Sequence, residues 1–355
     1  MRTLQSPLPP MEARSVETIP TEPGWQYEPK WDGFRCLAFR DRTSVELQSK
    51  AEKPLGRYFP ELVQALRDLS PRRFALDGEI VVPIRGKLDF DQLLQRIHPA
   101  ESRIRRLSTE HPALLVVFDL LEDETGESLL ELPMAERRPK LETFARRYFP
   151  KNGRIRLSPA STQLSQARRW YGKVGGDTDG LIAKRRDAAY QPGGRDAMVK
   201  IKPKRTADCV VGGFRYSAHG ESLGSLLLGL YDEAGLLDHV GFTSTIREAD
   251  RAAVLRKVEK LRGPPGFTGS APGGPSRWNG GRSTEWEPLR PSLVVEVEYD
   301  HFSGGRFRHG TAFRRWRPDK DPGQCTFDQI RRGASTDTAL LDRPPTRRLK
   351  QRSQG

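Results

Sequence analysis

The sequence contains no apolar run long enough for a membrane span. Its longest apolar runs, such as residues 113–118, are about a third of the ~18 residues that a spanning helix needs. The first 30 residues also contain no apolar core of the kind found in signal peptides. These absences argue against a membrane protein, and we expect a cytoplasmic one.

Cysteines are few and far apart. Cys36, Cys209 and Cys325 are each separated by more than a hundred residues. This spacing excludes a disulfide framework and a CxxC zinc knuckle, and it predicts three free thiols.

Acidic residues are outnumbered by basic ones. The 355 residues include 60 Lys+Arg and 46 Asp+Glu, which gives a formal net charge of +14. Residues 1–202 hold 35 basic and 28 acidic residues and residues 203–355 hold 25 and 18, so each part carries +7. A basic balance favours a polyanionic partner such as nucleic acid, although a well-solvated basic surface is the plain alternative.

The first 202 residues alternate short β-rich runs with helical patterns, which predicts an α+β domain. The predicted strands are 34–40, 74–82, 114–121, 179–185 and 198–202, and the predicted helices are 58–69, 132–148 and 164–173.

The remainder is mostly strands and suggests a small barrel of the OB type. The predicted strands are 208–214, 225–231, 236–242, 293–299 and 312–316, with one helix at 247–261. Residues 263–281 contain seven Gly and four Pro, which predicts a mobile loop. The domain boundary is expected near 203–206, and the end of the chain reads as a disordered basic tail.

The segment Glu28-Pro29-Lys30-Trp31-Asp32-Gly33-Phe34-Arg35 contains the motif K-x-D-G. A lysine becomes a nucleophile when neighbouring cations, a metal or desolvation remove its proton. Taken alone, the motif favours a surface β-turn, because Asp and Gly are both turn formers.

Three further segments carry acidic or aromatic candidates. Asp77-Gly78-Glu79 opens a strand in which the two carboxylates share a face. Phe118 ends a buried apolar strand, where it is either plain core or a platform for a base. Asp179-Gly180 leads from a turn into another apolar strand that ends at Lys184.

Basic residues complete the set. In the segment 198–202, alternation puts Lys200 and Lys202 on one face, and their repulsion implies open solvent or an anion between them. Arg314-Arg315-Trp316-Arg317-Pro318-Asp319-Lys320 is strongly basic and is in isolation a solvated face.

The order of these segments resembles that in the covalent nucleotidyltransferases, and among them the ATP-dependent DNA ligases. It runs K-x-D-G, D-G-E, a Phe-bearing strand, acid-G-x-x-x-K, K-x-K and R-x-D-K, between Glu28 and Lys320. The sequence at residues 27–33, 205–211 and 305–310 is similar to that of the compact bacterial C-type ligases. The resemblance implies an adenylation domain with antiparallel sheets at 1–203, an OB-fold β-barrel domain at 204–333, and a basic tail at 334–355.

The resemblance also implies roles for the motif residues. Lys30 would attack the α-phosphorus of ATP to form a lysyl-AMP, which then adenylates the 5′-phosphate of a DNA nick before the 3′-hydroxyl seals it. Lys200 and Lys202 would hold the α-phosphate. The remaining nucleotide contacts would be Glu28 to the adenine amino group, Phe118 stacked on the base, and Arg35 and Glu79 to the ribose.

The implied metal ligands are Asp32, Glu79 and Asp179, which would bind Mg²⁺ or Mn²⁺. Asp179 stands where the wider family often has Glu, so the shorter side chain would draw the metal inward or interpose a water.

Arg317 and Lys320 lie in the expected second domain. In the family this motif closes over the triphosphate for the first step and then swings away, which implies a hinge near 203–206. Lys50 resembles a position that is usually Arg, which puts its contact with the nick phosphate in doubt.

Scattered cysteines cannot build the four-cysteine zinc module of NAD-dependent ligases, so ATP is the expected donor. An RNA ligase, a capping guanylyltransferase and a nucleic-acid-binding protein with an inactive site are the rival interpretations. The expected partner is nicked duplex DNA, with a repair polymerase or end-binding protein as a further candidate. From the family we expect a monomer in the cytoplasm, associated with the nucleoid.

Overall fold

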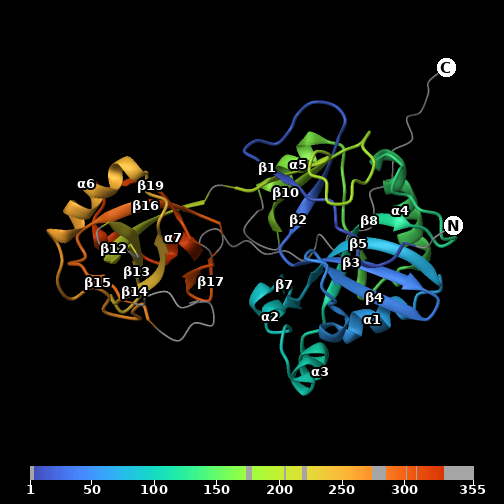
Figure 1. The fold of residues 1–355 in the computed structure, drawn as a ribbon, viewed down its shortest axis with the longest axis horizontal. Coiled ribbons are helices and arrows are strands. Elements are labelled where there is room, and N and C mark those ends of the chain that lie inside the picture. Colours follow the sequence, from blue (N-terminus) through green and yellow to red (C-terminus); the bar gives the residue numbers. More distant parts are fainter. Residues whose placement is uncertain are drawn as a thin grey trace. The chain divides into compact units, whose positions relative to one another are not determined.

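The chain divides after Pro203 into two compact units, which are treated one at a time (Figure 1). The computed structural model describes residues 4–172, 178–203, 205–217, 222–273, 285–300, 302–308 and 310–331. Within these ranges, every helix is too short or too polar to cross a membrane.

The larger sheet of the first unit is built from five strands. They are β3 (Phe34–Asp41), β4 (Ser44–Ser49), β5 (Arg73–Val81), β8 (Leu114–Glu122) and β9 (Ile155–Leu157), in the order β4-β3-β5-β8-β9. Helices α1 (Pro60–Arg67) and α4 (Met134–Tyr148) lie against this sheet (Figure 1). Apolar residues at alternate strand positions, such as Leu76, Leu115 and Val117, form the core with Leu62 and Phe144 of the helices.

A second, four-stranded sheet packs against the first. Its strands are β1 (Arg14–Val16), β2 (Trp25–Trp31), β10 (Thr178–Arg185) and β11 (Met198–Ile201), in the order β1-β11-β10-β2. Leu37, Phe39 and Leu121 of the larger sheet meet Met198 between the two sheets. On the opposite face, helix α5 (Leu164–Tyr171) covers the second sheet through Trp170. The unit is therefore layered, with helices outside and two sheets inside.

The smaller elements of the first unit connect these layers. They are η1 (Gly56–Tyr58), β6 (Pro83–Ile84), β7 (Lys87–Leu88), α2 (Phe90–Leu94) and α3 (Glu101–Glu110).

Each strand and helix predicted for this unit is present, with bounds that differ by a few residues. The turn interpretation of K-x-D-G holds only for its last two residues. Asp32 and Gly33 connect β2 to β3, whereas Lys30 lies within β2 and Trp31 is buried. Strands β2 and β4 and helix α3 were not predicted. The segment Glu28-Pro29-Lys30 interrupts the apolar alternation of β2, so its strand character is hidden.

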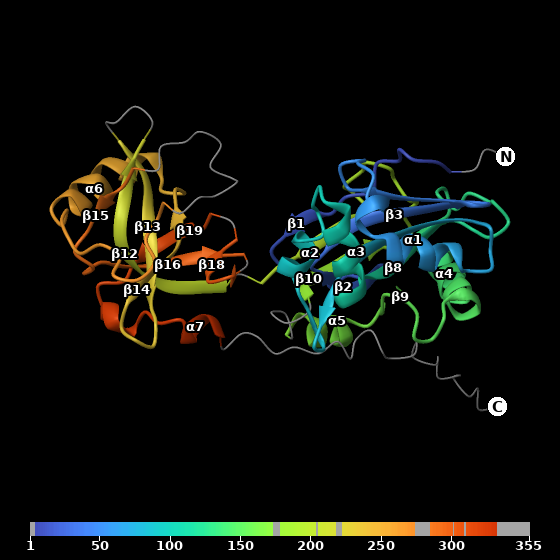
Figure 2. The same cartoon turned by 90° about the horizontal axis from the view of Figure 1, so that it is seen from below.

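The second unit is a small barrel. Its elements are β12 (Arg205–Tyr216), β13 (Leu223–Tyr231), β14 (Leu237–Thr243), α6 (Glu248–Glu259), β15 (Glu287–Pro288), β16 (Val294–Tyr299), β17 (Phe302–Ser303), β18 (Arg306–Phe307), β19 (Ala312–Trp316), η2 (Pro322–Gln324) and α7 (Asp328–Arg331). The main strands follow the order β14-β13-β12-β16-β19, and the edges meet where the backbone N–H of Thr311 donates to Phe242 O at 3.1 Å. Five strands that curl and close in this order form an OB-type barrel, with α6 outside it (Figures 1 and 2). The predicted strands and helix of this unit are confirmed.

The glycine-rich stretch is only partly described, because residues 274–281 lie outside the described ranges. The described part, 263–273, is a loop, as predicted, and it is held to the barrel because Phe267 is buried against Trp286 and His239. Ser270 also donates its backbone N–H and its hydroxyl to Asp238. The expected tail at 334–355 lies outside the described residues.

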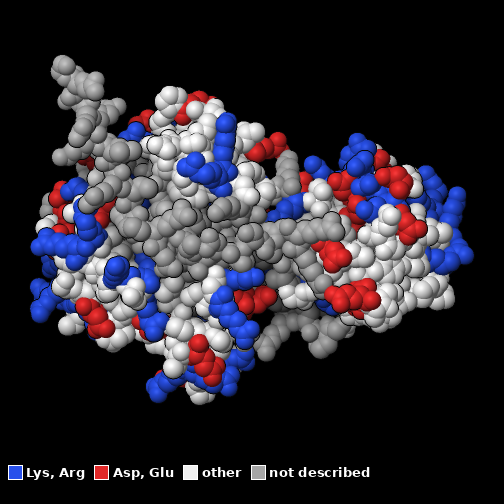
Figure 3. All heavy atoms as spheres, turned by 180° about the vertical axis from the view of Figure 1, so that it is seen from behind, with Lys and Arg blue, Asp and Glu red and all other residues white. Residues whose placement is uncertain are grey.

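Basic side chains occur on both units rather than at one end of the chain. On the face shown in Figure 3, Lys and Arg side chains are interspersed with Asp and Glu. The three cysteines are free and buried, as their spacing predicts.

Candidate functional site

Lys30 of β2 reaches the carboxylate of Asp179 on β10. Its Nζ lies 2.7 Å from Oδ2, and Nζ of Lys202, which follows β11, lies 2.9 Å from the same oxygen. The three residues meet because β10 pairs with both β2 and β11. Burial alone would raise the pKa of Asp179, but the two ammonium groups outweigh it and lower that pKa. One buried carboxylate thus holds the lysines of two motifs.

Motif glycines allow the strands to approach this closely. A Cβ at Gly180, where φ is +140°, would lie 2.2 Å from the carbonyl oxygen of Ile201. A Cβ at Gly33 would lie 2.2 Å from the carbonyl oxygen of Ile80. Glycine is therefore required at both positions for backbone contact between strands, and at Gly180 for its positive φ as well.

Lys200 belongs to the same cationic group. It alternates along β11 with Val199 and Ile201, which are buried. Burial lowers the pKa of Lys200, and the charges of Lys202 and Lys30 lower it further. These three lysines form a site where a phosphate chain would relieve like-charge repulsion.

Phe118 lies between charged residues of the two sheets. The Nζ of Lys184 on β10 lies 4.5 Å from the ring centroid and donates to Phe118 O at 3.2 Å. Lys184 also forms a buried ion pair with Glu28 of β2 at 2.9 Å. Glu28 accepts a second hydrogen bond from the Gln26 amide at 2.8 Å. An aromatic ring, a carboxylate and an ammonium group are therefore gathered at one point.

Arg35 lies over the same ring and is held in place by hydrogen bonds to Asp77. Its Cζ is 4.7 Å from the Phe118 centroid, and it donates two hydrogen bonds to Asp77, of 2.5 and 2.6 Å. The hydroxyl of Tyr190 donates to Asp77 at 2.7 Å and accepts from the backbone N–H of Met11 at 3.1 Å. Asp77 and Tyr190 are buried, so this network fixes the orientation of Arg35.

Glu79 lies on β5 directly opposite Arg35 in the strand register. Burial raises its pKa to about 7, against the opposing influence of the positive charges of Lys30 and Arg35, and nearby Asp32 raises it further. At neutral pH this carboxyl is therefore partly protonated. Asp32 and Glu79 both belong to the surroundings of Lys30.

Lys50 pairs with Glu12, and its positive charge also contributes to lowering the pKa of Lys200. The Nζ of Lys50 is 3.2 Å from Oε1 of Glu12, and Oε2 of Glu12 accepts from Arg195 at 2.7 Å. Lys50 is largely exposed.

Arg317 and Lys320 lie in the second unit, in and after the turn that follows β19. Arg317 donates to Asp208 at 2.8 Å and to Asp319 at 2.9 Å, and Nζ of Lys320 lies 3.5 Å from Asp208. The structure brings these two cations together around a carboxylate of β12.

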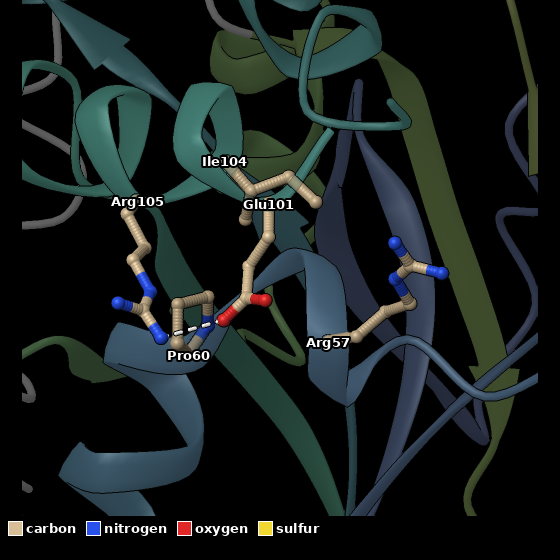
Figure 4. A pocket seen from close by; sticks show the side chains of 5 residues that line it. All are labelled: Arg57, Pro60, Glu101, Ile104 and Arg105. Atoms are coloured by element: carbon tan, nitrogen blue, oxygen red, sulfur yellow. Dashed lines mark hydrogen bonds and ion pairs between the residues drawn. The ribbon is translucent and has the colours of Figure 1, made fainter. Parts of the chain in front are cut away.

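A separate pocket of about 360 Å³ lies between α3 and the start of α1 (Figure 4). It is lined by Arg57, Pro60, Glu101, Ile104 and Arg105, and Arg105 pairs with Glu101 at 2.6 Å. None of the motif lysines lines it, so it is distinct from the lysine group.

The sequence matches two family models. Residues 10–202 match the ATP dependent DNA ligase domain, and residues 219–320 match the ATP dependent DNA ligase C terminal region. The chain belongs to the ATP-dependent DNA ligase family. The resemblance on which the sequence analysis relied is confirmed, and so is the expectation of an ATP-using enzyme.

Among known ligases, the chain is 45% identical to DNA ligase C2 of Mycolicibacterium smegmatis, in a match that covers 91% of this chain and 94% of that protein. It is 44% identical to DNA ligase C of Mycobacterium tuberculosis, over 92% and 94%. A solved Lig E DNA ligase superposes with a TM-score of 0.54 at 16% identity, covering 86% of this chain and 99% of the other. At that identity the likeness concerns the fold alone.

Ligases of this family use ATP with a divalent metal ion such as Mg²⁺ or Mn²⁺. No cluster of three or more His, Cys, Asp or Glu side chains that could enclose a metal occurs in the described part of the chain. Mg²⁺ at phosphoryl-transfer sites needs only one or two carboxylates, with waters and substrate phosphates as the other ligands. Asp32, Glu79 and Asp179 do not form one such cluster, and one or two of these carboxylates beside Lys30 would be enough to hold the ion. A metal held there would neutralise phosphate charge.

Three residues of these networks were missed as site candidates in the sequence. In the sequence Lys184 is only the last residue of the motif acid-G-x-x-x-K. Its signal is that a lysine inside an apolar strand requires a buried partner. Asp208 has the same kind of signal, because it precedes the apolar run Cys209-Val210-Val211. Tyr190 lies between predicted elements and offers no periodic signal.

Proposed function

We propose that the chain seals 5′-phosphate/3′-hydroxyl nicks in duplex DNA during repair, through an AMP group carried on Lys30. The observation that supports this most directly is the shared contact of Lys30 and Lys202 with one oxygen of Asp179, beside Lys200. This arrangement puts a potential nucleophile next to cations that can hold phosphate. Family membership supports the same chemistry.

In the first step, Nζ of Lys30 attacks the α-phosphorus of ATP. A nitrogen–phosphorus bond forms, the bond to the bridging oxygen breaks, and pyrophosphate leaves with the electron pair. Asp179 already accepts a hydrogen bond from Lys30 and so orients its Nζ, while the ammonium proton is released to solvent before the neutral amine attacks. Lys200 and Lys202 stabilise the charge on the α-phosphate, which is the main catalytic requirement in such a transfer.

In the second step, the 5′-phosphate of the nick attacks the phosphorus of lysyl-AMP, which releases Lys30. In the third step, the 3′-hydroxyl attacks the adenylated 5′-phosphate, the phosphodiester forms and AMP leaves. Both steps again move a phosphorus centre between two oxygen or nitrogen partners, so the same lysines serve throughout.

The base and ribose are assigned to the residues around Phe118. The Phe118 ring stacks on adenine, and Glu28 accepts from its amino group, which requires a rearrangement of the Lys184 contact. Arg35 and Glu79, opposite each other on neighbouring strands, contact the ribose. The held orientation of Arg35 supports this assignment, because a preformed contact costs less entropy on binding.

The second unit supplies Arg317 and Lys320, which orient the leaving pyrophosphate in the first step. We assign residues 1–203 to adenylation, residues 204–333 to an OB-fold domain that closes on ATP and then grips DNA, and residues 334–355 to a basic tail. A hinge at 203–206 would serve both states.

Nicked duplex DNA is the substrate that the family implies. A repair polymerase or an end-binding protein is proposed as a partner, with the enzyme acting as a monomer in the nucleoid. The basic charge carried by both parts of the chain supports contact of both with DNA.

The test is incubation of the purified protein with a metal ion and α-labelled ATP, followed by a denaturing gel and intact mass, and then a chase with nicked DNA. The expected result is one covalent AMP per chain that the chase transfers to DNA or consumes in sealing. If the purified protein already carries AMP, the AMP is first removed with pyrophosphate. Absence of an adduct with ATP would refute the proposal, and an adduct with GTP alone would favour a capping-type enzyme.

A further inference from the structure

One carboxylate in the second unit contacts both basic residues of the R-x-D-K motif. Oδ1 of Asp208 accepts from Nη1 of Arg317 at 2.8 Å, and Oδ2 lies 3.5 Å from Nζ of Lys320. Each oxygen therefore serves one cation. The side chain of Asp208 is 14% exposed, compared with 19% for Arg317 and 28% for Lys320.

Asp208 itself is firmly placed. It lies on β12, where it pairs with Glu296 of β16 in the strand register. Its backbone N–H donates to the side-chain oxygen of Gln329 at 2.8 Å, and its carbonyl accepts from the Gln329 amide at 2.9 Å. It also lies five residues after Pro203, on the strand that leaves the boundary between the units. Asp208 thus ties the motif to the first strand of its unit.

Asp319, the acidic residue of the motif itself, is less suited to holding Arg317 and Lys320 in place. Asp319 accepts from Nε and Nη2 of Arg317 at 3.0 and 2.9 Å, but its side chain is 63% exposed. Solvent screens such a contact, and the side chain is free to move with the turn. Asp208 is the better shielded of the two carboxylates and the one that reaches Lys320 as well.

We infer that Asp208 is a positioning residue for the adenylation step, which rests on the proposed function of Arg317 and Lys320. It fixes the spacing and orientation of the two cations before ATP arrives. Without it, two long flexible side chains would have to be ordered on the triphosphate during the reaction. The contact lies wholly within the second unit, so it is present whichever way the units are arranged.

The experiment compares Asp208→Ala and Asp208→Asn in the full chain with the wild type. Single-turnover formation of the AMP adduct is measured first, and sealing of a pre-adenylated nick second. For Asp208→Ala we expect the rate of adenylation to fall by roughly 100-fold, which is the loss that a small misplacement of catalytic groups typically causes. The rate of sealing of the pre-adenylated nick should stay within about twofold of the wild type. Asp208→Asn retains an acceptor for Arg317 but no charge for Lys320, so it should lose roughly 10-fold.

A matched control is Glu298→Gln, which removes another carboxylate of the same sheet. Glu298 pairs with Arg314 at 3.3 Å, outside the R-x-D-K residues. This variant should adenylate at the wild-type rate.

The reverse reaction provides a readout that a purely structural role would not move selectively. Pyrophosphate added to the adenylated enzyme regenerates ATP through the same transition state, so Asp208→Ala should slow it by the same factor as the forward step. Equal losses in adenylation and in sealing, with a lowered melting temperature, would mean a structural role and would overturn the inference. Unchanged or faster adenylation would overturn it too.

If Asp208→Ala does not fold, Asp208→Asn decides by the same criteria. If the wild type forms no adduct with ATP, the proposed function fails. If the wild type and the Asp208 variants all form the adduct at the same rate, only the role of Asp208 is refuted.

Discussion

Glu79 should make the protein less stable as the pH rises, and Glu79→Gln should abolish this effect. The pKa of Glu79 is raised from the ordinary value of 4.5 to about 7, chiefly by burial. Below pH 4.5 the carboxyl is neutral in both the folded and the unfolded chain, and its contribution to the free energy of unfolding is fully present. As the pH rises through 7, the unfolded chain has already lost the proton while the folded chain must ionise a buried group, so stability is lost.

The size of the effect follows from the two pKa values. The difference between 4.5 and about 7, at about 1.4 kcal/mol per pKa unit, corresponds to ~3 kcal/mol. More than half of this, about 2 kcal/mol, falls between about pH 5.5 and pH 8.5. Because Glu79 keeps some contact with solvent, we expect about 1–2 kcal/mol to be realised.

The assay is thermal unfolding of wild type and Glu79→Gln at these two pH values, with bound AMP first removed by pyrophosphate. Relative to the wild type, the variant should gain roughly 2–8 °C in melting temperature on going to the higher pH. Glu46→Gln removes an exposed carboxylate of strand β4 in the same sheet and should leave the wild-type pH dependence in place. A difference between Glu79→Gln and wild type that stays constant, or shrinks as the pH rises, would refute the reasoning.

Three other variants test the site. Lys30→Ala should form no AMP adduct, as intact mass would show; an adduct of normal yield would identify another nucleophile. Arg317→Ala should slow adenylation while sealing of pre-adenylated nicks stays largely intact, and equal loss in both assays would contradict a role in closure. Gly180→Ala should cost at least ~3 kcal/mol in unfolding free energy, because its Cβ would meet the carbonyl of Ile201 at 2.2 Å; a melting temperature near that of the wild type would show that the strands can separate without cost.

The predictions from sequence succeeded where the apolar pattern is regular. The alternation around Lys200 and Lys202 predicted the burial of Val199 and Ile201 in β11, and the apolar run ending at Phe118 predicted β8. The pattern fails at β2, where Glu28 and Lys30 are polar because of their partners on β10. Pairings between residues so distant in sequence leave no local signal.

The motif glycines illustrate a second limit. In the sequence Gly33 and Gly180 read as turn formers. In the structure Gly33 does lie in the connection between β2 and β3, but both glycines also permit close backbone contact with a neighbouring strand. Short-range patterns report a residue's own conformation and not the neighbour that tertiary structure brings to it. The order of the motifs indicated the lysines that come together, but the shared carboxylate oxygen emerged only from the fold.

The contact between Lys30 and Asp179 spans 149 positions in the chain, and this has a consequence for biosynthesis. A ribosome that has released β2 must make nearly the whole first unit before β10 and β11 can pair beside it. Until then Lys30 lacks the carboxylate that orients it, and the motif glycines have no strands to bring together. If Lys30 has the proposed role, we expect the nascent chain to become competent for adenylation only when β11 is in place.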